Sequence, residues 1–288
     1  MKILLIGGTG KVGSHLVQEL LAKGAQLRIL SRDAGRAGAV PAGVETVVAD
    51  ILQDTDTCID AFKDVDAMFM LNPLSSTEAT EGLIAVQIGK SAGIGRIVYQ
   101  SVGNIDEMAH VPHVASKIAI ERAIVESGMA WTFIRPSYFM QNDLTSKPGL
   151  EKGLYTQPLG KIGASSVDIR DIAEAEAIAL LEDGHEGQIY NLVGPDVLTG
   201  ESGAAIWSQA LGKEIRYVGS VDGWRAATKT FLPPWLNYDL GLMYRSIEEK
   251  GMLAGPDDVS RVTQLLKRSP RSYQDYVIEQ AGAWGMKA

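Results

Sequence analysis

The sequence predicts an α/β fold, in which a doubly wound parallel sheet carries a smaller, mostly helical C-terminal lobe. Short apolar runs alternate with amphipathic stretches through the first half of the 288-residue chain, as they do in successive βαβ units. A glycine-rich turn joins the first apolar run to the first amphipathic stretch. After Pro136 the alternation stops, and a segment rich in aromatic residues and proline follows.

Each predicted strand is a short apolar run that ends in small or polar residues. These runs lie at residues 2–6, 27–30, 44–49, 67–71, 96–101 and 131–134. The segments between them show helical periodicity or end at a glycine, which favours helices at residues 12–21, 59–62, 80–92 and 114–126. Strands alternating with helices indicate a parallel sheet with both faces covered.

Some segments after Pro136 are expected to return to the sheet domain, and the others to form the smaller lobe. Residues 146–163 are rich in glycine, proline and lysine, which predicts a loop, whereas 168–182 predict a helix and 189–193 a strand. We therefore expect a nucleotide-binding domain at residues 1–136 and 166–194. The smaller lobe is expected at 137–165 and 195–288, and its aromatic side chains fit its own core better than a substrate pocket or a dimer contact.

Composition narrows the classes of partner. A net charge of -8 with no basic run argues against a nucleic-acid partner. The single cysteine, Cys58, is expected in the core and cannot form an intrachain disulfide, which fits a reducing, cytoplasmic location. No apolar run approaches the about 18 residues that indicate a membrane span. The pair His110 and His113 lacks a nearby third ligand, so we predict no metal site.

The glycine-rich turn is the most specific motif. Gly7, Gly10 and Gly13 recur at intervals of three within Gly7-Gly8-Thr9-Gly10-Lys11-Val12-Gly13. Glycine lets the chain turn sharply from strand to helix and lets backbone N–H groups approach a pyrophosphate. The motif follows a predicted strand and opens a predicted helix, which is the context of a Rossmann-type dinucleotide site.

The ends of the next strands carry polar residues that fit the rest of a dinucleotide. Arg32 follows the second strand, where a guanidinium can pair with the 2′-phosphate of NADP or form a solvated turn with Asp33. We expect the first, with NADP(H) as cofactor. Asp50-Ile51 follows the third strand, where the carboxylate can meet the adenine amino group or simply cap a helix. Leu71-Asn72-Pro73 follows the fourth strand, as a further cofactor contact or a plain turn.

These motifs together resemble the NmrA-like group of atypical short-chain dehydrogenases. The resemblance rests on the glycine loop, Ser31-Arg32, Asp50, Ser101, Lys117, Arg135-Pro136-x-x-Phe139-x-x-Asn142 and Val167-Asp168-x-Arg170-Asp171. It covers most of the chain and is weakest after Gly200. It implies cofactor contacts at Ser101-Val102-Gly103 and Lys117, and a substrate near Tyr138, Phe139 and Asn142.

The resemblance also shows a departure at the catalytic position. Short-chain dehydrogenases use a serine and a Tyr-x-x-x-Lys motif, but here His113-Val114-Ala115-Ser116-Lys117 occupies that place, after Ser101. We therefore take Ser101, His113 and Lys117 as the candidate catalytic residues. His113 is either a proton donor or a wall residue with no proton role. A conjugated acceptor spreads the incoming charge and needs little proton donation, so positioning can replace the missing tyrosine.

Three functions fit these residues. The first is an NADPH-dependent oxidoreductase that transfers hydride to a conjugated, apolar small molecule such as a quinone, an enone or a dye. The second is an NADP(H)-binding redox sensor without turnover, which the missing tyrosine would permit. The third is a sugar-nucleotide epimerase or dehydratase, which the missing tyrosine disfavours. The protein is expected to act as a monomer or a homodimer.

Overall fold

A computed structural model describes residues 1–286 and divides the chain into two compact units. The first unit contains Met1–Val102, His113–Arg135 and Ile172–Tyr190. The second contains Gly103–Pro112, Pro136–Asp171 and the chain from Asn191 onward. The junctions after residues 135, 171 and 190 lie one to six residues from the expected boundaries, whereas the segment 103–112, expected in the nucleotide-binding domain, belongs to the second unit.

A seven-stranded sheet is built on the order β3-β2-β1-β4-β5-β6-β9, and the neighbours from β3 through β6 pair in parallel. The chain adds β2 and β3 on one side of β1 and then adds β4, β5 and β6 on the other side. This change in the order of strands is typical of a doubly wound sheet. The α/β prediction is therefore confirmed. The strands are β1 (Lys2–Ile6), β2 (Gln26–Ser31), β3 (Glu45–Val48), β4 (Ala67–Met70), β5 (Arg96–Gln100), β6 (Ala130–Pro136) and β9 (Gln188–Leu192).

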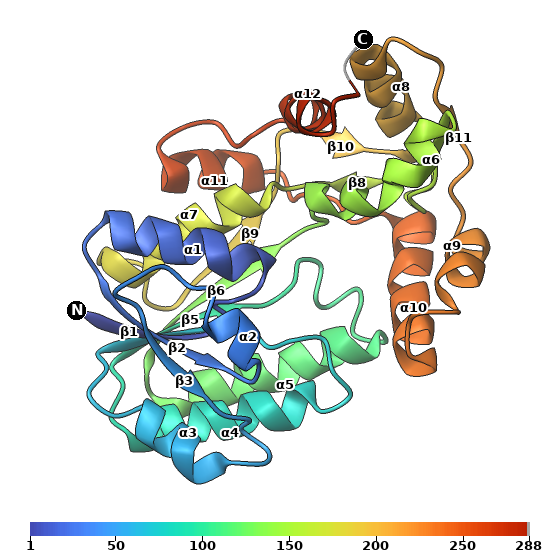
Figure 1. The fold of residues 1–288 in the computed structure, drawn as a ribbon. Helices are drawn as coiled ribbons and strands as arrows, with labels where there is room; N and C mark the ends of the chain where they lie inside the picture. The colour runs from blue at the N-terminus through green and yellow to red at the C-terminus, as the bar shows by residue number, and fades with distance from the viewer. Residues whose placement is uncertain (287–288) are drawn as a thin grey trace. The chain divides into compact units, whose positions relative to one another are not determined.

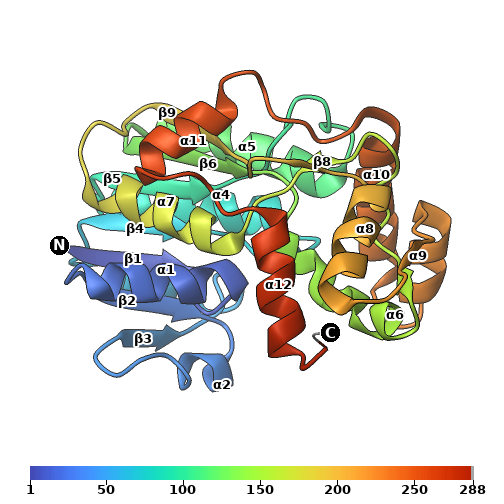
Figure 2. The same cartoon turned by 90° about the horizontal axis from the view of Figure 1, so that it is seen from above.

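Helices cover both faces of this sheet, as Figures 1 and 2 show. On one face lie α3 (Thr55–Ala61), α4 (Glu78–Ser91) and α5 (Pro112–Ser127), and on the other α1 (Lys11–Ala22) and α7 (Ile169–Leu181). Helices α4 and α5 each begin two residues before the predicted start. A short helix that the sequence did not predict, α2 (Ala34–Ala37), follows β2.

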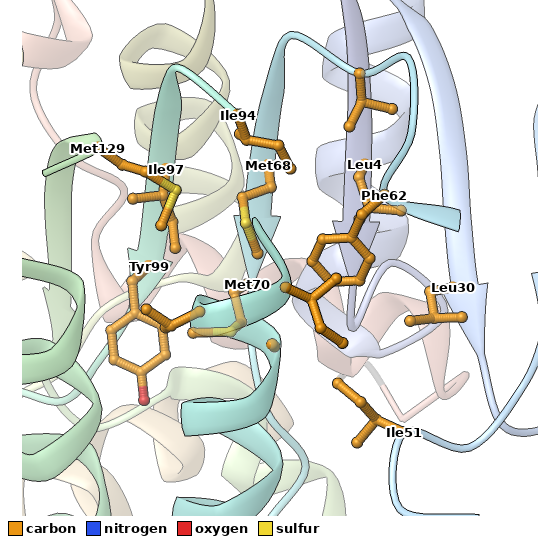
Figure 3. Close-up of a cluster of buried hydrophobic side chains, with 14 of the residues drawn as sticks. Leu4, Leu30, Ile51, Phe62, Met68, Met70, Ile94, Ile97, Tyr99 and Met129 are labelled. Atoms are coloured by element: carbon orange, nitrogen blue, oxygen red, sulfur yellow. The ribbon is translucent and has the colours of Figure 1, made fainter. Parts of the chain in front are cut away.

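The strands are apolar throughout because both faces of the sheet are buried. Alternate side chains of β1, β4 and β5 meet the helices α3, α4 and α5 in one core cluster, drawn in Figure 3. Leu4, Met68, Met70, Ile97 and Tyr99 belong to that cluster, whereas their neighbours along each strand point to the opposite face. Cys58 is also a member and is fully buried, which confirms its predicted place in the core.

The second unit is mostly helical, as predicted, with two small two-stranded sheets. Its helices and strands are η1 (Met140–Ser146), α6 (Lys147–Glu151), β7 (Leu154–Tyr155), β8 (Ala164–Ser165), β10 (Val197–Leu198), α8 (Gly200–Leu211), β11 (Arg216–Tyr217), α9 (Val221–Thr228), α10 (Pro234–Lys250), α11 (Asp258–Leu266) and α12 (Tyr273–Ala283). The prediction of a loop over 146–163 is wrong at α6 and β7. Such short elements carry too few periodic positions to stand out from a Gly- and Pro-rich stretch.

The aromatic residues of the second unit divide between core and surface. Trp207, Tyr155 and Tyr273 are among its largest fully buried side chains, and Tyr244 is buried as well. Phe231 is 70% exposed, however, and Trp235 and Tyr238 are also exposed, so the core interpretation is wrong for these three. No helix among residues 1–286 is both long and apolar enough to span a bilayer.

Candidate functional site: a dinucleotide cradle

The glycine loop between β1 and α1 adopts a turn that only glycine fits. Gly7 has a φ of 91°, and a Cβ there would lie 2.5 Å from the carbonyl oxygen of Leu71. A Cβ on Gly13 would overlap the carbonyl oxygen of Gly7 and lie 2.7 Å from Cα of Gly8. The loop is therefore folded back on itself and against the end of β4, which leaves its backbone bare of side chains.

The first turn of α1 is ready to receive an anion. Gly10 is the N-cap residue and offers no side-chain hydrogen bond to the helix, whereas its own N–H donates to the carbonyl oxygen of Gly7 at 3.0 Å. The first N–H groups of a helix lack intrahelical partners and carry partial positive charge. No acidic residue lies in this turn, and Lys11 is exposed there while Val12 packs into the core. With Thr9, these residues place unpaired N–H groups and one exposed lysine together at the start of α1.

Arg32 lies at the exposed end of β2 between two carboxylates. Its Nη1 is 3.9 Å from Oδ2 of Asp50 and 3.7 Å from Oε1 of Glu81. The Asp50 carboxylate also accepts a hydrogen bond from the N–H of Leu52 at 2.8 Å, which favours the capping interpretation without excluding a ligand contact. The structure thus brings together two of the predicted cofactor residues, while Ile51 beside them is buried in the core.

Buried polar atoms without partners gather at the ends of β4 and β5. Among residues 1–286, Oδ1 of Asn72, Oε1 of Gln100 and Oγ of Ser101 make no hydrogen bond, although all three residues are buried. Buried polar groups in folded proteins are almost always satisfied, so orphaned atoms at one edge of a sheet indicate a missing ligand or water. Leu71 and Pro73 flank Asn72 and are more accessible to solvent.

Most lysine side chains reach into solvent, but the side chain of Lys117 is buried. Its Nζ donates to Oε1 of Glu78 at 2.7 Å and lies 5.7 Å from the centre of the Tyr99 ring. Lys117 is 6% exposed and Glu78 1% exposed. Burial is the main reason that the pKa of Tyr99 is raised well above 10.0, and the charges of Glu78 and Glu121 add to it.

The other candidate catalytic residues are also buried. His113 lies one helical turn before Lys117 on α5 and is 7% exposed. The backbone N–H of Ser101 donates to the carbonyl oxygen of Ile134 at 2.8 Å, which holds the residue at the end of β5. Val102 follows it, and Gly103 opens the first segment of the second unit.

The predicted substrate residues lie in the second unit, around η1. Tyr138 is buried and its hydroxyl donates to Oε1 of Gln157 at 2.9 Å. The amide nitrogen of Gln157 in turn donates to the carbonyl oxygen of Asn142 at 2.8 Å. Phe139, which pairs with Val167 through an isolated bridge, is half-buried. These contacts tie the three residues to Gln157 and Val167 within the second unit.

The sequence of this chain matches a known protein family and is similar to that of a named enzyme. Residues 1–269 match the NmrA-like family. An NAD(P)H azoreductase of Xenophilus azovorans is 33% identical over 289 residues, which cover 98% of this chain and 99% of the relative. This chain belongs to the NmrA-like family.

Solved structures confirm the fold of this NmrA-like chain. The NADPH complex of the Escherichia coli quinone oxidoreductase QOR2 superposes with a TM-score of 0.86 at 24% identity, covering 96% of this chain and 99% of the other. The NADP(H) complex of the Citrobacter sp. triphenylmethane reductase gives 0.86 at 23% identity, covering 97% and 99%. At such identities the likeness speaks for the fold alone.

The residues of this NmrA-like chain fit a dinucleotide. A pyrophosphate requires a turn without side chains and a helix N-terminus without a side-chain cap, and the Gly7–Gly13 loop supplies both. Ribose hydroxyls require polar partners, and the orphaned atoms at the ends of β4 and β5 can supply them. Among the described residues, no group of three His, Cys, Asp or Glu side chains has the arrangement of a metal site. His110 instead shares a hydrogen bond of 3.0 Å with Oγ of Ser246.

Sequence reasoning missed Glu78 and Glu81, the two buried carboxylates at the start of α4. Oε1 of Glu81 accepts hydrogen bonds from the hydroxyls of Thr77 at 2.6 Å and Ser75 at 3.0 Å. Because the helix was predicted to begin at residue 80, Glu78 fell in the preceding loop. The signal was present, since hydroxyl residues followed within a turn by glutamate are typical of a helix N-terminus.

Proposed function

We propose that this chain is an NADPH-dependent oxidoreductase that transfers hydride to a conjugated, apolar small molecule such as a quinone, an enone or a dye. The observation that carries the proposal is the glycine cradle at the start of α1, with Arg32 at the end of the neighbouring strand. Similarity over nearly its whole length to an NAD(P)H azoreductase, together with membership of the NmrA-like family, supports the same reaction class.

Different residues of the chain bind different groups of the cofactor. The N–H groups of the Gly7–Gly13 loop bind the pyrophosphate, and Arg32 neutralises the 2′-phosphate. Asp50 meets the adenine beside Ile51, whose side chain packs into the core, while residues 71–73 and 101–103 line the path toward the nicotinamide. Lys117 binds the nicotinamide ribose. When bound, NADPH supplies the hydride.

The acceptor requires positioning more than acid–base catalysis. Reduction of a quinone consumes one hydride and one proton, and the negative charge that the hydride brings is spread over the conjugated system. His113, at the place of the usual tyrosine, or water delivers the proton. Tyr138, Phe139 and Asn142 contact the apolar acceptor. A binding protein that senses the redox state of the cofactor is the second candidate, because the tyrosine proton donor is replaced.

Loss of NADPH absorbance in the presence of quinones, enones, azo dyes and triphenylmethane dyes tests the proposal. We expect turnover with at least one class of acceptor. Arg32→Ala should weaken NADPH binding by on the order of tenfold or more while leaving NADH binding unchanged, since a charge-assisted hydrogen bond to the 2′-phosphate is lost. Tight NADPH binding without turnover on any acceptor would favour the sensor, and equal effects on the two cofactors would refute the role of Arg32.

A further inference from the structure

The ion pair between Glu78 and Lys117 stands out among the charged contacts of the first unit. It joins the first residue of α4 to the second turn of α5 across 39 positions of sequence, with Nζ and Oε1 2.7 Å apart. The side chains of Lys117 and Glu78 are 8% and 0% exposed. Most other ion pairs of this unit, such as Lys63 with Asp60, lie on the surface.

Burial of this pair is not explained by stability. Removing two charges from water costs several kcal/mol each, and an apolar pair of the same size often serves a fold as well or better. The two helices nevertheless pack closely beneath the pair, because Gly82 on α4 meets Ile120 on α5, and a Cβ on Gly82 would lie 2.6 Å from Cγ1 of Ile120. An apolar contact at this level is therefore already present, and the charges one turn away need another reason.

The position of the pair supplies that reason. Glu78 follows the Leu71–Pro73 segment that leaves β4, and Lys117 follows Ser101, where β5 ends. The Lys117 ammonium also lies over the Tyr99 ring of β5. Both charged groups thus come from the helices that follow β4 and β5, and α4 lies beside one of the orphaned atoms, since a Cβ on Gly82 would lie 3.4 Å from Oδ1 of Asn72.

We infer that Glu78 is a positioning residue, which holds the Lys117 ammonium in place for the nicotinamide half of the dinucleotide. The inference rests on the proposed function. A lysine side chain is a flexible stem that ends in a point charge with three donors. Glu78 takes one donor, fixes the direction of the ammonium and keeps a positive charge buried beside the ribose hydroxyls, whose oxygens accept the remaining donors.

Two ligands separate this role from simple structural support. NADPH contains the nicotinamide ribose, whereas adenosine 2′,5′-bisphosphate contains only the half that Arg32 and Asp50 would hold. In Glu78→Gln, we expect NADPH affinity, measured by calorimetry, to fall about tenfold, the effect of losing a charged hydrogen bond. The affinity for adenosine 2′,5′-bisphosphate should be unchanged. If both ligands weaken equally, or neither does, the inference is wrong.

Glu121→Gln is the matched control. Glu121 lies one turn after Lys117 on the same helix, and its carboxylate pairs with Arg135 at 2.5 Å, with 9% of the side chain exposed. This variant also breaks a largely buried ion pair, but one that joins α5 to β6 and involves neither Lys117 nor α4. We expect it to lower the thermal stability comparably and to leave the affinities for both ligands as in the wild type. Loss of NADPH affinity in this control would mean that any broken ion pair disturbs the site, which overturns the inference.

A double-mutant cycle shows whether Glu78 acts through Lys117. Lys117→Met should lose NADPH affinity, and adding Glu78→Gln to it should cause no further loss. The double variant also removes both charges, so it is expected to fold even where Glu78→Gln alone does not. Additive losses would contradict the inference. Failure of the wild type to bind NADPH would overturn the proposed function itself, whereas normal wild-type binding with an unaffected Glu78→Gln overturns only the role of Glu78.

Discussion

Environment, more than residue type, sets the charge of the buried carboxyl groups. Burial alone would raise the pKa of Asp168, but hydrogen bonds from the side chain and backbone of Arg170 outweigh it, and the pKa falls below 3.8. Glu176 on α7 is fully buried, and neither of its carboxylate oxygens has a hydrogen-bond partner among residues 1–286. Burial therefore raises its pKa well above 4.5. The first acid is ionised at neutral pH, and the second resists ionisation.

Glu176→Gln tests that difference through the pH dependence of stability. A raised folded pKa means that stability is fully present below 4.5 and is lost as the pH rises toward the raised value. Relative to the variant, the wild type should lose about 1.4 kcal/mol of unfolding free energy per pH unit between that ordinary value and the raised one. Denaturant unfolding between pH 5 and about pH 7 measures the difference.

The control is Glu174→Gln, a change of the same kind on the same helix at a half-buried side chain. It shows what the substitution of an amide for a carboxyl on this helix does by itself. A Glu176→Gln variant that runs parallel to the wild type over this range would show that the carboxyl finds a partner or water in the folded protein.

At the scale of elements, the turn from β1 into α1 depends on glycine for space rather than for flexibility alone. Gly13 is the clearest case, because it has an ordinary helical position yet no room for a side chain. The carbonyl oxygen of Gly7 fills the volume where a Cβ would stand. The contact lets the first turn of α1 pack against the loop that precedes it, which sets the direction of the free N–H groups.

Gly13→Ala should therefore open the loop. We expect NADPH affinity to fall by at least about tenfold, and the protein to lose about 1–3 kcal/mol of stability, as is typical of overpacking. Gly95→Ala is the control, since a Cβ there would meet only the carbonyl oxygen of Asp66 at 3.7 Å, an ordinary contact. Fluorescence titration with NADPH measures both variants. Wild-type affinity in Gly13→Ala would mean that the loop does not hold the pyrophosphate.

At the scale of the whole chain, the two units have interiors of different kinds. The first is built on the apolar cluster between the sheet and α3, α4 and α5. The second contains a buried polar network centred on Asp143, whose carboxylate accepts hydrogen bonds from Trp207 at 3.0 Å, Tyr155 at 3.0 Å and the hydroxyl of Tyr273. These side chains come from η1, α8, β7 and α12, so one carboxyl group joins four elements of the second unit.

Burial raises the pKa of Asp143 from 3.8 to about 6, although its three hydrogen bonds act in the opposite direction. The stability that this group contributes is therefore full below pH 3.8 and is lost as the pH rises through about 6. Asp143→Asn removes the titration and preserves the shape, because the amide can donate to Tyr155. The wild type should lose about 3 kcal/mol relative to this variant between pH 4 and pH 7.

Asp168→Asn is expected to differ from the wild type in the opposite sense. The pKa of Asp168 is lowered in the fold, so its stabilising effect is present above 3.8 and is lost as the pH falls through the lowered value. Chemical unfolding as a function of pH compares both variants with the wild type. The account of the network is wrong if Asp143→Asn follows the wild-type curve.

The sequence by itself determined the alternation of strands and helices, the glycine loop and the polar residues that end each strand. These features depend on local patterns: apolar runs for strands buried on both faces, periodicity for the helices, and a glycine spacing with a backbone cause. The first unit was predictable in outline for this reason. The predicted roles of Arg32, Lys117 and His113 follow from the same motifs and stay predictions.

Only the tertiary structure decided which charges are buried together. Glu78 and Lys117 meet because α4 and α5 pack closely at Gly82, and no local pattern shows that register. The same holds for Asp143, whose partners lie 12 to 130 positions away along the chain. The desolvation that sets the charge of a carboxyl group comes from packing between distant segments, so it exists only once the chain has folded.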